Sequence, residues 1–348
     1  TGCKKEEVEE VIAPLVSDGQ TTESTEEAQE EKDPLIPEID TSVELQAGSR
    51  VAVVSKSTSG EFWGLVKKGM EQAIADVNEA YGFKKEDQVT MTFEGASDEK
   101  DVESQVNTID AVIAENPDVL CVSASDMDSL QAQLEAAKEN GIPVVAFDSG
   151  VTDSKMVRAF RGTDNTRVGE IAAYRLATAI GKMGKVADFS AQEKTQSIQE
   201  RVSGFTNYIT NYPDIEVVEI VYQDQVDDMT AAMQEVLDKY PQLDGVFCDN
   251  ADIADLYLDM KKDETKDSIV MVGVDATAKQ QEAIRNGKEV GVVSQQPYAM
   301  GYQTIWTALL TTAPKKSVEI KRNVRIDPAW IDSSNIDDPT YSSYLYAN

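Results

Sequence analysis

The sequence predicts an α/β protein of two similar lobes, each built on a parallel, doubly wound sheet with flanking helices. Two observations lead to this prediction. From Arg50 onward, short apolar runs typical of buried strands alternate with longer amphipathic segments typical of helices. The pattern of the first half then recurs in the second half. A chain of 348 residues is also long enough for two lobes of ordinary size.

The elements of the first half follow one another as strand and helix. We expect strands over 50–55, 89–96, 118–123 and 142–148, and helices over 61–82, 101–116 and 127–140. Apolar residues at helical spacing mark one face of the first helix: Phe62, Leu65, Val66, Ala73 and Val77. Ser97 or Asp98 is the expected cap of the second helix, and Gly141 ends the third. This alternation implies a parallel sheet that is covered on both faces.

The repeat is clearest where PDVLCVSASD (117–126) is followed much later by LDGVFCDNAD (243–252). The interval from Cys121 to Asp148 is 27 residues, and so is the interval from Cys248 to Asp275. An offset of 127 also places Ser123 on Asn250. Unrelated strand–helix units could share the apolar runs, but the paired aspartates at strand ends need a common plan. Ligands of parallel sheets bind beyond the carboxyl ends of the strands, so we expect these polar residues to face one cleft.

A second pair of segments repeats at an offset of 135. VAVVS (51–55) falls on VADFS (186–190), and Gly69 falls on Gly204. Cys121 and Cys248 each lie inside an expected buried strand, where cysteine behaves as a small hydrophobic residue. The second copy therefore supplies the opposite wall of the expected cleft.

Charge and composition exclude several classes of function. The formal charge of −31 argues against nucleic-acid binding, which needs a basic surface. The absence of histidine removes serine–histidine and cysteine–histidine nucleophiles and histidine-containing metal sites. The acidic segments 126–135 and 249–259 lack the glycine and spacing of a calcium loop. We therefore expect no metal, no cofactor and no membrane-spanning run of apolar residues.

The N-terminal segment has a composition of its own. Thr-Gly-Cys-Lys-Lys resembles the end of a bacterial lipoprotein signal, with Cys3 as the lipidated residue; the alternative is an incidental cysteine. Residues 4–47 carry fourteen acidic residues and three lysines, and contain no aromatic residue. Such a segment buries too little apolar surface to fold. We expect residues 1–47 to be a lipid-anchor site and a disordered tether that holds the folded body off a surface.

Motifs in a fixed order carry a resemblance over residues 48–345. They are GIPVVAFDSGV (141–151), FRGTDNTRVGEIAA (160–173), RVSGF (201–205), VFCDNAD (246–252), VMVGVDA (270–276) and SQQPYAMGYQ (294–303). With them the chain resembles the sugar-type bacterial substrate-binding proteins of ABC importers, the ribose- and galactose-binding kind. The resemblance implies the type I periplasmic-binding-protein fold, in which a three-segment hinge joins the lobes.

The resemblance also implies a set of ligand-binding residues. They are Ser59, Phe62, Trp63, Ser123, Asp148, Ser149, Arg201, Asp224, Asn250, Asp275 and Gln295. The aromatic side chains would pack on the C–H face of a sugar, although ordinary core packing is the alternative for them. The carboxylates would accept hydrogen bonds from sugar hydroxyls, with Arg201 as a donor and as the counter-ion between Asp148 and Asp275. Gly60 and Ser149 stand where ribose binders usually have asparagine and arginine, which argues against ribose itself.

We therefore expect a non-enzymatic, extracytoplasmic solute-binding protein that captures a neutral pentose or hexose and delivers it to an ABC permease by hinge closure. The alternative is a sensor module that presents a sugar or an autoinducer-type ligand to a signalling receptor. A glycan hydrolase using Asp148 and Asp275 is disfavoured, because Arg201 should keep both residues ionised. We expect a monomer that touches the membrane only through its lipid anchor, on the cell surface of a Gram-positive-type bacterium or in a periplasm.

The expected domain boundaries follow from where the chain should cross between the lobes. These crossings are expected near 161–166, 293–297 and 322–327. The N-terminal lobe would comprise residues 48–163 plus 296–324, and the C-terminal lobe residues 164–295 plus 325–348.

Overall fold

The structure is a computed structural model that describes residues 32–264, 267–314 and 318–346. The chain divides into two units, Thr1–Ile36 and Pro37–Asn348, and the second unit contains the folded body. Cys3 and most of the predicted tether lie outside the described residues.

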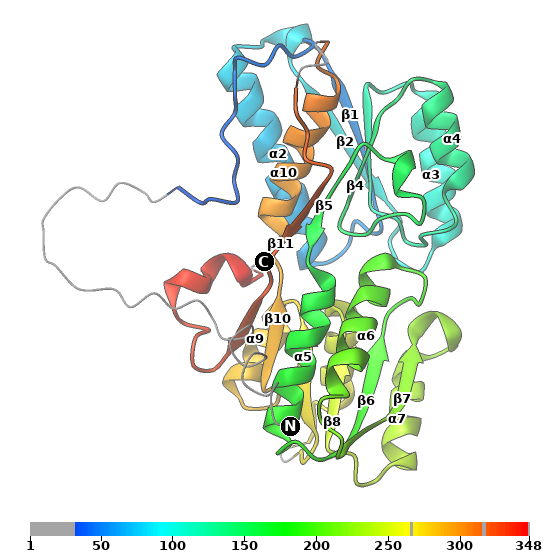
Figure 1. Cartoon of the computed structure of the whole chain (residues 1–348), viewed down its shortest axis with the longest axis vertical. Helices are drawn as coiled ribbons and strands as arrows, with labels where there is room; N and C mark the ends of the chain where they lie inside the picture. The colour runs from blue at the N-terminus through cyan, green and yellow to red at the C-terminus, as the bar shows by residue number, and fades with distance from the viewer. Residues whose placement is uncertain (1–31, 265–266, 315–317, 347–348) are drawn as a thin grey trace, which may run out of the picture. The chain divides into compact units, whose positions relative to one another are not determined.

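Two six-stranded sheets form the framework of the folded body (Figure 1). The first has the order β11-β5-β4-β3-β1-β2, with bounds Asn323–Ile326, Ala159–Thr163, Val144–Phe147, Val119–Val122, Arg50–Ser55 and Thr90–Gly95. The second has the order β12-β10-β9-β8-β6-β7, with bounds Ala329–Asp332, Gly291–Ser294, Val270–Val274, Gly245–Cys248, Gly184–Ser190 and Ile215–Tyr222. The two orders are identical once β1–β5 and β11 are replaced by β6–β10 and β12. All pairings are parallel except that of β10 with β12.

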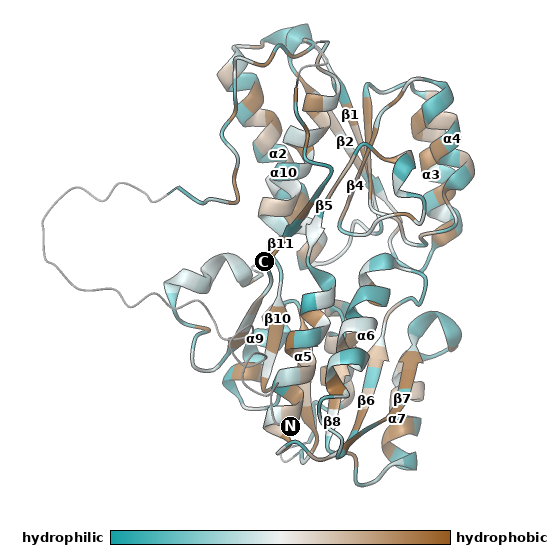
Figure 2. Ribbon diagram, viewed as in Figure 1, coloured by the Kyte–Doolittle hydropathy of each residue, from teal (hydrophilic) through white to brown (hydrophobic). Residues whose placement is uncertain are grey.

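Helices cover both sheets, and each sheet with its helices is called a lobe below. The first lobe carries α2 (Glu61–Tyr81), α3 (Val102–Ala114), α4 (Gln131–Glu139) and α10 (Pro297–Thr311). The second carries α5 (Asn165–Ala179), α6 (Gln196–Ile209), α7 (Met229–Lys239), α8 (Ala251–Met260) and α9 (Ala278–Arg285). Short 3-10 helices complete the described residues: η1 (Lys85–Asp87), η2 (Ser154–Met156), η3 (Gln223–Gln225) and η4 (Pro339–Tyr344). Figure 2 shows that hydrophobic residues concentrate in the central strands and on the helix faces toward them. The predicted two-lobed α/β fold is confirmed.

The repeated glycines mark equivalent helix crossings in the two lobes. A Cβ atom on Gly69 of α2 would lie 2.0 Å from the carbonyl oxygen of Tyr298 on α10. A Cβ atom on Gly204 of α6 would lie 2.2 Å from the carbonyl oxygen of Thr166 on α5. Only glycine permits so close an approach of two helix backbones. The offset of 135 in the sequence therefore reports a duplicated packing contact.

The chain passes between the sheets at three places. It leaves β5 for α5 at Asp164, leaves β10 for α10 through residues 295–296, and leaves β11 for β12 through residues 327–328. The first two passages fall within the segments expected from the sequence, and the third begins at the end of its segment. Helix α10 consequently packs beside α2, although some 230 residues separate them in the sequence (Figure 1).

Two local expectations differ from the structure. Residues 37–47 were expected in the tether, but Leu45 is buried and the Tyr81 hydroxyl donates to the carbonyl oxygens of Asp40 and Val43, at 2.9 and 2.6 Å. The burial of Leu45 and the bonds from Tyr81 therefore place this segment against the folded body. Helix α3 is capped by Asp101, whose carboxylate accepts from the Ser104 amide, and neither Ser97 nor Asp98 caps it.

The buried cysteines and the helix lengths agree with the sequence. Cys121 on β3 and Cys248 on β8 are both buried with free thiols, and burial raises the pKa of each thiol. Across the described parts of the chain, every helix is too short or too polar to cross a membrane.

Candidate functional site

A cavity of 180 Å³ lies between the two lobes at the carboxyl ends of their strands. Eight of the eleven predicted ligand-binding residues line it: Ser59, Phe62, Trp63, Asp148, Arg201, Asn250, Asp275 and Gln295. Its walls also include polar residues that the sequence did not single out: Lys56, Glu61, Glu99, Asp252, Asp255 and Thr277. Both lobes contribute to the lining, as the duplicated strand ends predict.

The two strand-end aspartates occupy equivalent positions. Asp148 directly follows β4 and Asp275 directly follows β9. Their φ angles are 59° and 76°, in the left-handed region that asparagine and aspartate tolerate better than other residues with a Cβ atom. The duplication therefore extends to the backbone conformation at the site.

Asp148 is held by a buried cation and a hydroxyl. Its Oδ2 atom lies 2.9 Å from Lys56 Nζ and accepts from Ser123 Oγ at 2.7 Å. Lys56 also donates to Ser149 Oγ at 3.1 Å. Burial by itself lowers the pKa of Lys56, but the charges of Asp148 and Glu99 outweigh it and raise that pKa overall. Ser123 and Ser149 thus lie behind the cavity wall, where they position Asp148 and Lys56.

Arg201 does not have the role that the sequence suggested. It was expected to be the counter-ion between Asp148 and Asp275. Instead Nε donates to Asn165 Oδ1 at 3.0 Å, and Nη1 donates to the carbonyl oxygen of Asp249 at 2.9 Å. Lys56, in the loop after β1, lies beside Asp148 instead.

Asp275 is held by neutral donors. Its Oδ1 accepts from Gln295 Nε2 at 2.8 Å and from the Tyr346 hydroxyl at 2.7 Å, and its Oδ2 accepts from the Ala251 amide at 2.9 Å. Gln295 also accepts from Thr163 Oγ1 at 2.7 Å, so it joins the passage after β10 to the end of β5. Tyr346 was not expected at the site, because no local pattern connects it with a residue 71 positions earlier.

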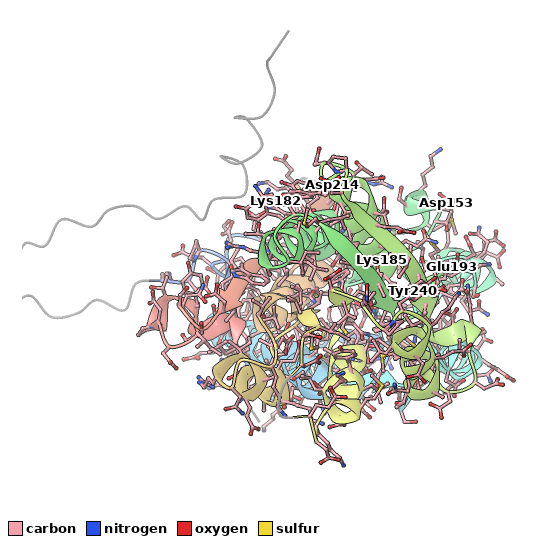
Figure 3. All side chains as sticks on the ribbon, turned by 90° about the horizontal axis from the view of Figure 1, so that it is seen from below. Asp153, Lys182, Lys185, Glu193, Asp214 and Tyr240 are labelled. Atoms are coloured by element: carbon pink, nitrogen blue, oxygen red, sulfur yellow. The ribbon has the colours of Figure 1, made fainter. Side chains whose placement is uncertain are left out.

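Asp224 lies outside the cavity, contrary to its assignment from the sequence. It belongs to η3, after the edge strand β7, and its side chain accepts from the Glu193 amide at 3.2 Å. Glu193 lies at the rim of the molecule in Figure 3. The exposed edge of the sheet places Asp224 in solvent.

The aromatic residues at the start of α2 form one wall. The rings of Phe62 and Trp63 meet edge to face with centroids 4.9 Å apart, and both residues are largely buried while lining the cavity. Trp63 Nε1 donates to Glu99 Oε1 at 2.8 Å, which fixes the indole. Phe62 and Trp63 therefore pack in the core and also line the cavity.

Polar atoms without a hydrogen-bond partner in the described chain remain on both walls of the cavity. Among the residues that the structure describes, no partner is seen for Asp148 Oδ1, for Arg201 Nη2 or for Asn250 Nδ2, whereas Asn250 Oδ1 caps α8 at the Ile253 amide. One acceptor and two donors on opposite walls match vicinal hydroxyls, which both donate and accept. The arrangement is suited to hold a small polyol.

Several acidic residues line the same cavity. Loss of hydration and the charges of Glu99, Asp275 and Asp255 raise the pKa of Asp252 to about 7. Burial raises the pKa of Asp255 to about 6, although a hydrogen bond from Thr277 opposes the shift. Within the described ranges, no group of acidic residues and cysteines could hold a metal ion. The sequence analysis did not single out Asp252 and Asp255, because their spacing on α8 is that of a solvated helix face.

Comparison with curated proteins shows distant relatives. The ribose import binding protein RbsB of Bacillus subtilis (strain 168) is 27% identical over 203 residues, which cover 58% of this chain and 66% of the relative. The protein of the same name from Escherichia coli (strain K12) is 25% identical over 191 residues, 55% of this chain and 64% of the relative. The aligned part thus spans just under two thirds of each relative.

Comparison with solved structures covers more of the chain. A solute-binding protein of an ABC transporter from Agrobacterium vitis, with bound D-fucose, is 28% identical with a TM-score of 0.77, covering 86% of this chain and 100% of that one. A carbohydrate transporter solute-binding protein from Agrobacterium radiobacter, in complex with D-arabinose, is also 28% identical with a TM-score of 0.77 and covers 86% and 99%.

A family model described as a periplasmic binding protein domain matches residues 51–313. The match spans both lobes and the first two passages between them. The resemblance seen in the sequence is confirmed: the chain belongs to the periplasmic binding protein family, which comprises extracytoplasmic binding proteins rather than enzymes.

Proposed function

We propose that this protein is the solute-binding component of an ABC importer and that it captures one monosaccharide, a pentose or a hexose, between its lobes. The observation that carries the proposal is the 180 Å³ cavity lined by Asp148 from one lobe and by Asn250 and Asp275 from the other. The cavity is smaller than the roughly 300–1,000 Å³ of sites for drug-sized ligands, which favours a single sugar ring. Relatives named for ribose import and structures with bound D-fucose or D-arabinose support the same class of ligand.

The available polar atoms are sufficient for useful affinity. A hydrogen bond to a charged group contributes roughly 1.5–3 kcal/mol net. Asp148 and Arg201 supply two such bonds, Asn250 supplies a neutral one, and the rings of Phe62 and Trp63 add apolar contact. The three hydrogen bonds contribute roughly 3.5–7.5 kcal/mol, and apolar contact with the two rings brings the total toward the ~8 kcal/mol of a micromolar complex.

Closure of the lobes would couple capture to delivery. Hydrogen bonds already join the lobes: Thr195 Oγ1 donates to the carbonyl oxygen of Ser125 at 2.6 Å, and the Gly150 amide donates to Gln196 Oε1 at 2.8 Å. A sugar that contacts both walls stabilises only the closed form. It therefore shifts the population toward that form. The closed form would then dock on the permease.

The proposal extends to the anchoring of the protein. We place the protein as a monomer outside the cytoplasmic membrane, with lipid attached at Cys3 and the acidic segment as its tether. The positions of Cys3 and of the tether up to residue 31 lie outside the described residues. Incorporation of labelled palmitate into the protein made in a bacterial host, and its loss in Cys3→Ser, would test the anchor.

Calorimetric titration with D-ribose, D-arabinose, D-fucose, D-allose, D-tagatose and xylitol tests the ligand class. We expect at least one of them to bind, and Asp148→Asn and Arg201→Met each to weaken that binding by roughly 10- to 150-fold. Asp224→Asn should leave it unchanged, because Asp224 lies outside the cavity. Absence of binding by the whole panel, or unchanged affinity in both cavity variants, would refute the proposed site.

A further inference from the structure

Two aspartates lie inside the second lobe, on the side of the sheet that α6 covers. Asp188 is on β6 and Asp249 follows β8, and both are fully buried. The ladder between these strands pairs Asp188 with Phe247, so Asp249 lies two residues further along the same face of the sheet. The Phe247 ring stacks on the Phe205 ring of α6, with centroids 4.8 Å apart. The two carboxyl groups therefore lie on the same side of the sheet as Arg201, which α6 also carries.

Each carboxyl group has one satisfied and one unsatisfied oxygen in the described part of the chain. Asp188 Oδ1 accepts from Ser190 Oγ at 2.7 Å, and Asp249 Oδ1 accepts from the Ala191 amide at 3.0 Å. Among the described residues, neither Oδ2 atom has a hydrogen-bond partner, and both are buried. An interior oxygen without a donor is costly, above all when it is charged. One proton on the pair removes one of the two charges and turns an acceptor into a donor.

Burial and mutual repulsion favour this proton. Burial and then the charge of Asp249 raise the pKa of Asp188, although the hydrogen bond from Ser190 opposes the shift. Burial also raises the pKa of Asp249, against the opposing effects of Ser190 and of the positive charge of Arg201. Two neighbouring carboxyl groups without water do not ionise together easily. These effects favour a pair that keeps one proton, and one negative charge, at neutral pH.

The other titratable groups around the pair contribute little charge. Burial and nearby carboxylates raise the pKa of Tyr222, at the end of β7, to about 12. Burial and neighbouring carboxylates also raise the pKa of the Cys248 thiol, so both groups stay neutral near neutral pH. Glu193 and Asp224 approach from the loop after β6 and from η3, but they are exposed and water screens their charges. Arg201 is therefore the main charged neighbour of the pair.

Asp249 also holds Arg201 in place. The side chain of Arg201 is almost fully buried, and both hydrogen bonds that the structure gives it go to neutral acceptors: Asn165 Oδ1 at 3.0 Å and the carbonyl oxygen of Asp249 at 2.9 Å. The guanidinium and the Asp249 carboxyl group also attract each other through their charges. The backbone of Asp249 thus fixes the guanidinium, and its side chain sets the charge beside it.

We infer that Asp249 is a positioning residue for Arg201, and that it acts as half of an acid pair that shares one proton with Asp188. The inference rests on the proposed function, because it assumes that Arg201 binds the sugar. Loss of the proton at higher pH adds a second negative charge near the guanidinium. Arg201 is then drawn toward the pair, and its bond to the sugar weakens. Sugar affinity should therefore fall as the pH rises through the range in which the pair loses its proton.

Calorimetry of the full chain between about pH 5 and 9 tests the inference. The probe is the member of the panel of D-ribose, D-arabinose, D-fucose, D-allose, D-tagatose and xylitol that binds most tightly. We expect its affinity to fall at least about threefold across this range. Asp188→Asn should remove the fall, because an amide still donates to Asp249 but has no proton to lose. Glu289→Gln is the matched control: Glu289 is another buried acid of the second lobe with a raised pKa, and its loss should leave the fall as it is.

A double-mutant cycle separates positioning from general damage to the fold. Asp249→Ala should weaken sugar binding about tenfold when Arg201 is present, and by less than about twofold in the Arg201→Met chain, because a positioning residue acts through the residue that it positions. An equal loss in both chains would assign the effect to the neighbouring Asn250 or to the fold, and would overturn the inference. If Asp249→Ala does not fold, the pH profile of Asp188→Asn decides alone.

The outcomes for the inference and for the proposed function are distinct. Sugar binding with a flat pH profile, or with a fall that Asp188→Asn leaves unaltered, overturns the inference while the proposed function stands. Failure of every sugar to bind refutes the proposed function and the inference together.

Discussion

Replacing Lys56 with methionine should leave the buried Asp148 carboxylate without its cation. The change removes the ammonium and keeps an unbranched chain of similar length. The side chains of Lys56 and Asp148 are 5% and 4% exposed, and their charged atoms lie 2.9 Å apart. Removing one partner of a buried pair costs about 3–5 kcal/mol, because the remaining charge is left without compensation. We expect Lys56→Met to lower the free energy of unfolding by this amount at neutral pH.

A double variant separates charge from packing. Lys56→Met/Asp148→Asn should recover much of the loss, because the uncompensated charge is gone.

Urea unfolding followed by circular dichroism at neutral pH gives the free energies of unfolding of the unsubstituted protein, the single variant and the double variant. A loss below about 1 kcal/mol in Lys56→Met would place the pair among weak surface pairs and refute the reasoning. So would an equal loss when Asp148→Asn is already present, since the two residues would then act independently.

Three other changes test separate features. Gly69→Ala should cost about 1–3 kcal/mol by forcing two helices apart, whereas Gly64→Ala, on the open face of the same helix, should gain up to about 1 kcal/mol in urea unfolding. Burial and the neighbouring Asp249 raise the pKa of Asp188. The folded state therefore keeps a proton that the unfolded state releases. Stability should fall as the pH rises above the ordinary carboxyl range. Melting temperatures against pH should show a shallower fall in Asp188→Asn; an unchanged slope would contradict this assignment. Glu200→Gln breaks a part-buried ion pair with Arg325, beside the third passage between the lobes. The free energy of unfolding should fall by about 1 kcal/mol or less. A larger loss would contradict this and show that the pair is a main connection between the lobes.

The fold was predictable because the repeat consists of strands and helices that can be recognised from short stretches of sequence. A strand, a helix and a second strand fix the interval from Cys121 to Asp148, and the same elements fix the interval from Cys248 to Asp275. Strand ends of a parallel sheet share one edge, so the location of the cavity followed from the same pattern.

The partners of the charged residues were not predictable in the same way. Lys56 stands in a short polar run after β1 that has the composition of any loop, and only the folded backbone shows that it reaches Asp148. Asp252 has the pattern of a solvated helix residue until the opposite lobe brings Glu99 near it. Both cases depend on distances between segments far apart in the chain, which neither spacing nor composition records.

The return of α10 to the first lobe has a consequence for biosynthesis. The surface of α2 that packs on α10 stays uncovered until the ribosome has added residues 297–311, by which time every helix of the second lobe has been made. Domains generally fold as units during translation, so the first lobe should complete its structure only after helices α5 to α9 of the second lobe have been made. A nascent chain stalled before residue 297 should therefore expose an apolar helix face to chaperones and proteases.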